Sequence, residues 1–272
     1  MTTSFYWTDH STDDFASRDL SETVVILPIA AIEQHGPHLP VKVDAAINAG
    51  ILDRMTLLLD TGADVLILPA LSIGKSDEHL AYPGTLTISG QTLRLVWLDI
   101  ARSVKRAGAR KLILFNSHGG QISLMDMTCR DIRVELDMLA VACSWFRIAP
   151  VEDLFSSAEI LHGIHGGDIE TSMMLAIAPE LVAMDKAEDF VPLTVGIEQS
   201  GSLLTAEGAV GFGWQAQDLH PAGVCGNAAN ADADKGVVVL DRAAAALVRL
   251  IEAVRSFDIS RLTSETRFSA MR

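Results

Sequence analysis

The chain has 272 residues, of which 49% are hydrophobic and 21% charged, a composition that excludes wholesale disorder and allows one sizeable core. Its formal net charge of −14 disfavours nucleic acid and anionic membranes as partners, because both bind clustered lysine and arginine. The three cysteines form no Cys-x-x-Cys pair and the polar N-terminus does not resemble a signal peptide, so we expect reduced thiols in a cytoplasmic protein.

Short apolar runs rich in β-branched residues alternate with helical patterns along the chain. Repeated strand-then-helix units imply a parallel sheet with helices on both faces. We therefore expect an α/β fold in which a mostly parallel central sheet forms the middle of three layers, within a single domain over residues 1–272. The expected strands are 24–27, 65–68, 111–115 and 139–144, and the expected helices are 44–59, 92–106, 123–137, 169–178 and 232–254.

Residues 185–230 differ from the rest of the chain, because they are rich in glycine and show little periodicity. We expect this segment to be an irregular excursion over the sheet edge or over a site. Loops of that length usually have a function or a partner.

The densest polar motif follows the first expected strand and reads Ile32-Glu33-Gln34-His35-Gly36-Pro37-His38, with Asp44 at the start of the next helix. Two carboxylates and an imidazole that converge near the carboxyl end of a strand suit Zn²⁺, Mn²⁺ or Fe²⁺. His38 is the weaker ligand candidate. The alternative is a polar loop in which Asp44 only caps the helix.

A second motif, Asn116-Ser117-His118-Gly119-Gly120-Gln121, follows the third expected strand. Gly119 and Gly120 allow the backbone to approach a ligand closely, and His118 would lie at the edge where open α/β sheets bind ligands. The alternative is a glycine-rich turn with a satisfied histidine.

A third motif, His165-Gly166-Gly167-Asp168-Ile169-Glu170, opens a helix. His165 is a candidate general acid or base, and Glu170 a candidate ligand or orienting group. The alternative is that the acids only cap the helix. His79, which precedes a Pro-Gly turn, could contact a substrate or lie on the surface. Dinucleotide-binding, P-loop and nucleophile-elbow motifs are absent from the sequence.

These motifs together resemble the creatininase family of metal-dependent amide hydrolases. The resembling segments are LPIAAIEQHGPHLPVKVD from Leu27, the stretch from His79 to Thr85, FNSHGGQ from Phe115, HGGDIETSMMLAIAPELV from His165 and GVCGNAANADADKG from Gly223. The resemblance implies one α/β domain, a site for two divalent metal ions, a small-molecule substrate and a ring-like homo-oligomer, commonly a hexamer.

The resemblance also assigns roles to individual residues. It implies that Glu33, Asp44 and His118 hold one ion, that His35 and the bridging Asp44 hold the other, and that His165 is catalytic. A substrate-side tryptophan of the family falls at Phe146, beside Trp145.

The sequence departs from the creatininase pattern at positions that shape the site. In creatininase itself a glutamate at the position of Gly120 completes the second metal site, and a glutamate stands at the position of Ile164. Creatinine is therefore not the expected substrate, and the Ser-His-Gly-Gly form is nearer to relatives that deformylate pyrimidine intermediates or trim peptides. Glu170 is our candidate for the missing carboxylate.

The leading hypothesis is a binuclear metal-dependent amidohydrolase that cleaves the C–N bond of a cyclic amide, a formamide or another small amide. One alternative is a metal-dependent isomerase or lyase that acts on a carbonyl substrate with the same ligands. Another is a non-catalytic family member that only binds a ligand.

Overall fold

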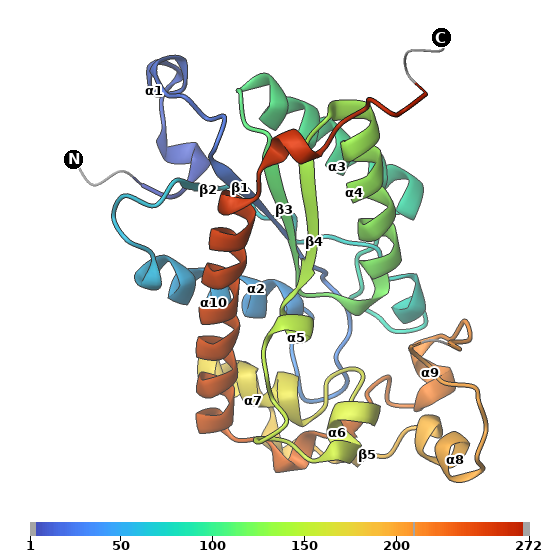
Figure 1. The fold of residues 1–272 in the computed structure, drawn as a ribbon. Helices are drawn as coiled ribbons and strands as arrows, with labels where there is room; N and C mark the ends of the chain where they lie inside the picture. Colours follow the sequence, from blue (N-terminus) through green and yellow to red (C-terminus); the bar gives the residue numbers. More distant parts are fainter. Residues whose placement is uncertain (1–3, 209, 269–272) are drawn as a thin grey trace.

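A four-stranded parallel sheet forms the centre of the computed structural model, which describes residues 4–208 and 210–268 (Figure 1). Its spatial order is β2-β1-β3-β4. In register, Val24 pairs with Val65 on one side and with Lys111 on the other. Because all the pairings are parallel, the four carboxyl ends lie at the same edge. The strands are β1 (Val24–Ile29), β2 (Val65–Ile67), β3 (Lys111–Asn116) and β4 (Leu139–Ser144).

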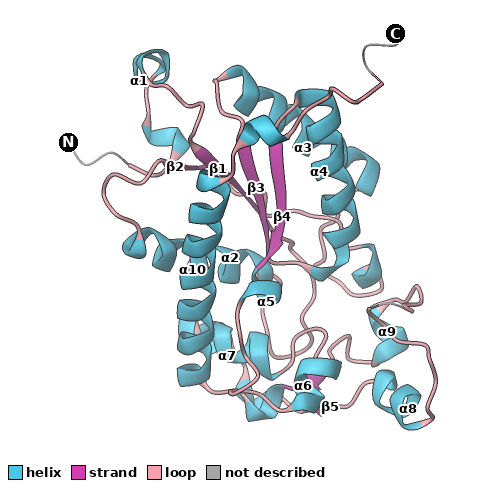
Figure 2. Ribbon diagram, viewed as in Figure 1, coloured by secondary structure: helices cyan, strands magenta, loops and turns pink. Residues whose placement is uncertain are grey.

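Helices cover both faces of this sheet, as Figure 2 shows. Val24 and Ile26 of β1 belong to one hydrophobic core, whereas Val25 and Leu27 belong to the other. Successive strand side chains point to opposite faces, which explains why the strand sequence is apolar throughout. The α/β fold with three layers is confirmed. The first core contains residues of α2 (Val43–Leu58), α7 (Asp168–Ile177) and α10 (Ala233–Ser256), and the second contains residues of α3 (Gly90–Arg106) and α4 (Ile122–Leu136).

Every predicted strand and helix is present, with ends that differ by at most two residues. The alternative in which Asp44 caps the helix is wrong: Lys42 occupies the N-cap of α2, and Asp44 lies inside the first turn. Its carboxylate is therefore not needed as a cap. Three short helices of four to six residues were not predicted, since so few residues show no periodicity: α1 (Thr12–Ser17), α5 (Trp145–Ile148) and α6 (Ser157–His162).

The glycine-rich excursion contains more regular structure than we expected. It holds α8 (Leu193–Gln199), α9 (Ala216–Leu219) and an antiparallel pair formed by β5 (Asp189–Phe190) and β6 (Gly226–Asn227). The Cys225 amide donates a hydrogen bond of 2.8 Å to the carbonyl oxygen of His165. The end of the excursion is thus fastened to the turn that carries His165. The single-domain organisation stays a prediction.

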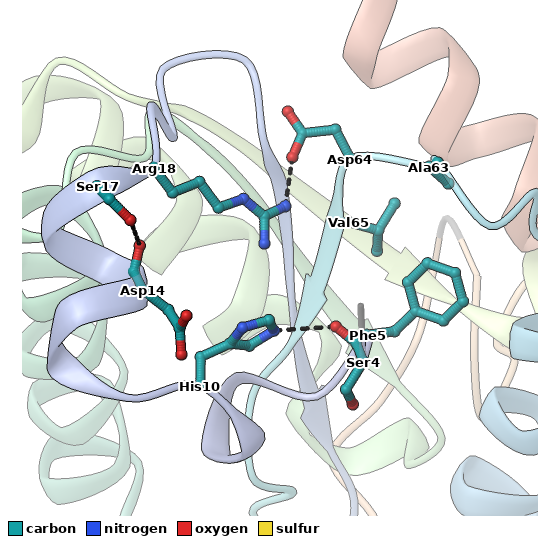
Figure 3. Close-up of a pocket in the computed structure, with 10 residues that line it drawn as sticks. Ser4, Phe5, His10, Asp14, Ser17, Arg18, Ala63, Asp64 and Val65 are labelled. Atoms are coloured by element: carbon teal, nitrogen blue, oxygen red, sulfur yellow. Dashed lines mark hydrogen bonds and ion pairs between the residues drawn. The ribbon is translucent and has the colours of Figure 1, made fainter. Parts of the chain in front are cut away.

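The amino-terminal edge of the sheet carries a separate set of polar contacts. The Lys111 ammonium lies 2.7 Å from Glu22 Oε2 and 2.6 Å from the carbonyl oxygen of Arg255. A cavity of about 390 Å³ lies near this edge, and Arg18 and Asp64 form an ion pair of 2.6 Å in its lining (Figure 3). The three cysteines are buried free thiols. Among the described residues, no helix has the length and apolar character needed to cross a bilayer.

Candidate metal centre

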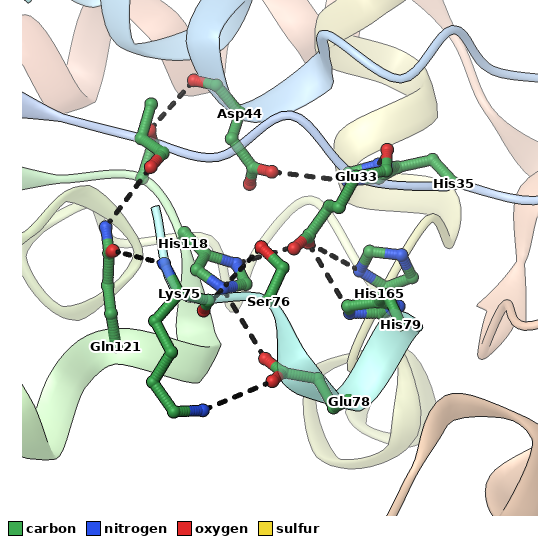
Figure 4. Close-up of polar contacts among 12 residues, drawn as sticks. Glu33, His35, Asp44, Lys75, Ser76, Glu78, His79, His118, Gln121 and His165 are labelled. Atoms are coloured by element: carbon green, nitrogen blue, oxygen red, sulfur yellow. Dashed lines mark hydrogen bonds and ion pairs between the residues drawn. The ribbon is translucent and has the colours of Figure 1, made fainter. Parts of the chain in front are cut away.

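Polar side chains from several segments converge at the carboxyl edge of the sheet (Figure 4). The loop after β1 supplies two of them, the first turn of α2 supplies one, and the others come from segments distant in the sequence. All are at most 9% exposed. The converging residues are Glu33, His35, Asp44, His79, His118 and His165.

The Glu33 carboxylate lies at the centre of the histidines. Its Oε1 atom is 3.1 Å from Nδ1 of His118, 3.5 Å from Nε2 of His79 and 3.6 Å from Nδ1 of His165. Its Oε2 atom is buried and has no hydrogen-bond partner in the described part of the chain. One carboxylate oxygen is therefore surrounded by imidazoles, and the other is free for a ligand.

His35 and Asp44 leave two further buried atoms without partners among the described residues, Nε2 of the imidazole and Oδ2 of the carboxylate. These two atoms lie 3.8 Å apart. The other imidazole nitrogen, Nδ1, donates to the carbonyl oxygen of Glu33 at 3.0 Å, so Nε2 of the neutral ring carries a lone pair. A ligand atom at Nε2 therefore faces a ligand atom of Asp44.

The unpartnered atoms fit a divalent cation. Glu33, His35 and Asp44 each offer one ligand atom, and these atoms lie within 4.8 Å of one another. Buried polar groups are nearly always hydrogen-bonded, and an unsatisfied one costs about 1–3 kcal/mol. Carboxylate and imidazole ligands suit Zn²⁺, Mn²⁺ and Fe²⁺, so the donor set agrees with the metals expected from the sequence.

The electrostatics of the cluster also favour a bound cation. Burial and the neighbouring Glu33 carboxylate raise the pKa of Asp44 well above its usual value. Burial alone would lower the pKa of His118, but Glu33, Asp44 and Glu78 outweigh it and raise that pKa to about 10. The buried acids thus stabilise a positive charge at the point where they converge.

His79 and His165 lie next to the unpartnered ligand atoms. The ring centroid of His165 is 4.0 Å from that of His35 and 4.3 Å from that of His79. Burial lowers the pKa of His165 to about 4 and that of His79 to about 2, so both rings are neutral at neutral pH. His79 is not a surface residue. His165 comes from the turn between α6 and α7, rather than from a loop that directly follows a sheet strand.

Comparison with known proteins decides the family. A family model described as creatinine amidohydrolase matches residues 8–251. The chain belongs to the creatininase family. Creatinine amidohydrolase of Pseudomonas putida is 32% identical over 189 residues, which cover 64% of this chain and 71% of that protein. The mycofactocin precursor peptide peptidase of Mycolicibacterium smegmatis is 32% identical over 175 residues, or 62% of this chain and 65% of the peptidase.

A solved structure described as creatininase with manganese has the same fold. It superposes with a TM-score of 0.72 at 26% identity, and the match covers 94% of this chain and all of that chain. The family and its named relatives support metal-dependent amide hydrolysis in general.

Glu170, in the first turn of α7, lies near the same nitrogen of His35 that faces Asp44. Its Oε2 atom is 3.7 Å from Nε2 of His35 and accepts a hydrogen bond of 2.6 Å from the Gly166 amide. Burial raises the pKa of its carboxyl group. This position keeps Glu170 a candidate for the carboxylate that the creatininase pattern has at position 120.

Glu78 is a fourth carboxylate at this site, and the sequence motifs do not predict it. Its Oε1 atom lies 3.4 Å from Nε2 of His118. A Cβ atom at Gly120 would overlap that oxygen, so the absence of a side chain there makes room for Glu78. The sequence feature that could have indicated Glu78 is the acidic pair Asp77-Glu78 before His79. The spacing of residues along the chain does not connect this pair with position 120.

The remaining candidates lie farther from the centre. Trp145 is 3% exposed and belongs to the larger hydrophobic core, whereas Phe146 is 37% exposed, so only Phe146 keeps surface for the predicted substrate contact. Gly119 is exposed beside the site. His38 forms a 2.9 Å hydrogen bond with Thr171 Oγ1, which agrees with its weaker standing as a ligand.

Proposed function

We propose that this chain is a hydrolase that cleaves a C–N amide bond of a small molecule with the help of two divalent metal ions. The observation that carries the proposal is the set of buried ligand atoms without partners, on Glu33, His35 and Asp44, beside two neutral histidines. The family of the chain supports the reaction class.

Two overlapping ligand sets divide these residues between the ions. Glu33, Asp44 and His118 would hold one ion, and His35, Asp44 and Glu170 the other, with Asp44 shared. Bound there, the ions would polarise the amide carbonyl and lower the pKa of a water molecule to near neutrality. Zinc, manganese and iron all match the donor set.

His165 is the residue that we assign to proton transfer. Its Nε2 atom is held 2.6 Å from the carbonyl oxygen of Gln34, which fixes the ring, and its Nδ1 atom faces Glu33. A neutral imidazole in this position can take a proton from the attacking water and deliver it to the departing nitrogen.

The proposed substrate is a small amide, and two positions that differ from creatininase, 120 and 164, bear on its class. Positions 120 and 164 are glycine and isoleucine, which departs from the creatininase pattern. A formamide, a cyclic amide other than creatinine, or a short peptide therefore fits the proposal better than creatinine does.

We also propose that the protein is a cytoplasmic homo-oligomer, and by family resemblance a hexamer. A monomer of about 29 kDa in light scattering would contradict this proposal.

Hydrolysis in ¹⁸O-labelled water tests the proposal against its rivals. The purified protein, chelated and then reloaded with zinc or manganese, is offered a panel of formamides, cyclic amides and short peptides. We expect an amine and a carboxylate that carries one labelled oxygen, only after reloading. An unlabelled product would favour an isomerase or a lyase. Tight binding without any product would favour a non-catalytic family member.

A further inference from the structure

Gln34 connects two of the three histidines that face Glu33, namely His79 and His165. Its side chain is buried, with Oε1 2.9 Å from the Gly36 amide and Nε2 2.7 Å from the carbonyl oxygen of Gly223. The same Nε2 atom lies 2.8 Å from Nδ1 of His79. The main-chain oxygen of Gln34 lies 2.6 Å from Nε2 of His165.

Two main-chain groups fix the orientation of the Gln34 amide. The Gly36 N–H can only donate, so the atom it meets must be the amide oxygen. The Gly223 carbonyl can only accept, so the atom it meets must be the amide nitrogen. One hydrogen of that nitrogen is then left over, and it points at His79.

The remaining hydrogen determines the tautomer of His79. Since Gln34 donates to Nδ1, this nitrogen must carry a lone pair. A neutral His79 therefore has its proton on Nε2, the atom that lies 3.5 Å from Glu33 Oε1. His79 presents an N–H group to the centre of the site.

His165 has the same tautomer for a different reason, and it turns its other nitrogen toward Glu33. A carbonyl oxygen 2.6 Å from Nε2 can only accept, so Nε2 of His165 carries the proton. The Gln34 side-chain nitrogen also lies 3.3 Å from this atom, but both of its hydrogens are directed elsewhere. The lone pair of neutral His165 is on Nδ1, which lies 3.6 Å from Glu33 Oε1.

We propose that Gln34 is a positioning residue that holds His79 and His165 in the same Nε2–H tautomer but with different nitrogens toward Glu33, so that one ring presents a donor and the other an acceptor to the same space. The tautomers follow from the contacts alone, whereas their use rests on the proposed function. In amide hydrolysis, His79 would donate a hydrogen bond to the carbonyl oxygen of the substrate, and His165 would accept a proton from water.

The proton balance of hydrolysis agrees with this division. The C–O bond forms as His165 Nδ1 takes a proton from the attacking water, and the C–N bond breaks as the same proton passes to the leaving nitrogen. His79 keeps its proton throughout and serves only as a hydrogen-bond donor to the oxygen that gains negative charge. Each histidine therefore needs the tautomer that Gln34 gives it.

Imidazole ¹⁵N NMR of the full-length zinc-loaded protein tests the proposal, because nitrogen shifts distinguish an N–H from a lone pair. We expect His79 to be protonated on Nε2 and His165 to carry its proton on Nε2, with free Nδ1. In Gln34→Glu, the ionised carboxylate can only accept a hydrogen bond from His79. The proton of the His79 ring should therefore move from Nε2 to Nδ1. His165 should not change, because the main-chain carbonyl holds it. Gln91→Glu, at an exposed position of α3, is the matched control and should leave both rings unchanged.

Wild-type His79 protonated on Nδ1 would overturn the proposal without any variant. So would an unchanged His79 in a folded Gln34→Glu protein. If that variant does not fold, Gln34→Met removes the donor, and we expect His79 to populate both tautomers. The expected Nε2–H tautomers in a protein that hydrolyses no amide would contradict the proposed function only, so the two failures are distinguishable.

Discussion

Buried polar groups at the two edges of the central sheet differ in whether they have hydrogen-bond or ion-pair partners. At the amino edge, the buried Lys111 ammonium meets both the Glu22 carboxylate and the carbonyl oxygen of Arg255. At the carboxyl edge, ligand atoms of Glu33, His35 and Asp44 have no partner within the described ranges. The strands are the same, but in the described part of the chain the buried carboxylate and imidazole atoms without a partner all lie in the segment that leads from the carboxyl end of β1 into α2.

This difference separates a structural role from a functional one. A protein that needs a buried charge only for stability satisfies it within the chain, as Lys111 is satisfied. Unsatisfied buried groups cost stability, so their concentration at the carboxyl edge implies a ligand that compensates for them. The comparison therefore assigns metal binding to the carboxyl edge, and each prediction below tests that assignment.

Loss of His118 should have the largest effect. We expect His118→Ala to lose bound metal and amide hydrolysis together, because its Nδ1 atom faces the Glu33 carboxylate at 3.1 Å. Metal analysis and an activity assay check this. Full metal content in the folded variant would remove His118 from the ligand set.

His165→Ala should lower kcat by roughly 10²–10⁴-fold, the usual range for a general acid or base. Metal content should stay near that of the wild type, because His165 is not a proposed ligand. Steady-state kinetics and metal analysis on the same sample check both values. An unchanged kcat would show that His165 is not the general acid or base, and Glu170 or His79 would become the next candidate.

The metal-free protein should lose stability in acid. Burial lowers the pKa of His35, His38 and His165 from 6.5 to about 4, so the unfolded chain binds more protons than the folded chain between these values. Their contribution is complete above pH 6.5 and is lost as the pH falls through about 4.

His118 has the opposite sign. Its raised pKa stabilises the metal-free fold below pH 6.5 and ceases to do so as the pH rises through about 10. Urea titrations across this pH range should show that the free energy of unfolding decreases both in acid and in alkali. The decrease in alkali should be absent from His118→Ala.

Lys111→Met should affect stability but not function. The substitution leaves the carbonyl oxygen of Arg255 without its donor, at a cost of about 1–3 kcal/mol. Metal content and kcat should equal those of the wild type. Loss of metal in the folded variant would show that the two edges are not independent.

Arg18→Ala should have the smallest effect. Its ion pair with Asp64 is about one third exposed, and such pairs contribute about 0–1 kcal/mol. A urea midpoint close to that of the wild type, with unchanged activity, is the expected result. A metal-content change would assign a function to the cavity in Figure 3.

The sequence predicted the fold and the convergence of the main site residues for one physical reason. Parallel strands have their carboxyl ends at one edge, so Glu33 and His118, which follow two neighbouring strands, had to meet. Asp44 joins them because α2 begins directly above that edge. These inferences need only local patterns and a rule of topology.

The residues that the sequence did not identify act over long distances in the chain. The partners of Gln34 include His79 and Gly223, and neither lies in its own motif. Glu78 reaches His118 through space that Gly120 leaves open. Such contacts depend on how loops fold back across the sheet edge, which composition and periodicity do not encode.

Anomalous diffraction from crystals of the zinc-loaded protein tests the central claim most directly, because it locates the ions without a known substrate. We predict one or two ions at the carboxyl edge, with donor atoms of Glu33, His35, Asp44 and His118 at about 2.0–2.3 Å. Ions bound only elsewhere, or a cluster that stays without metal in saturating zinc, would contradict the account.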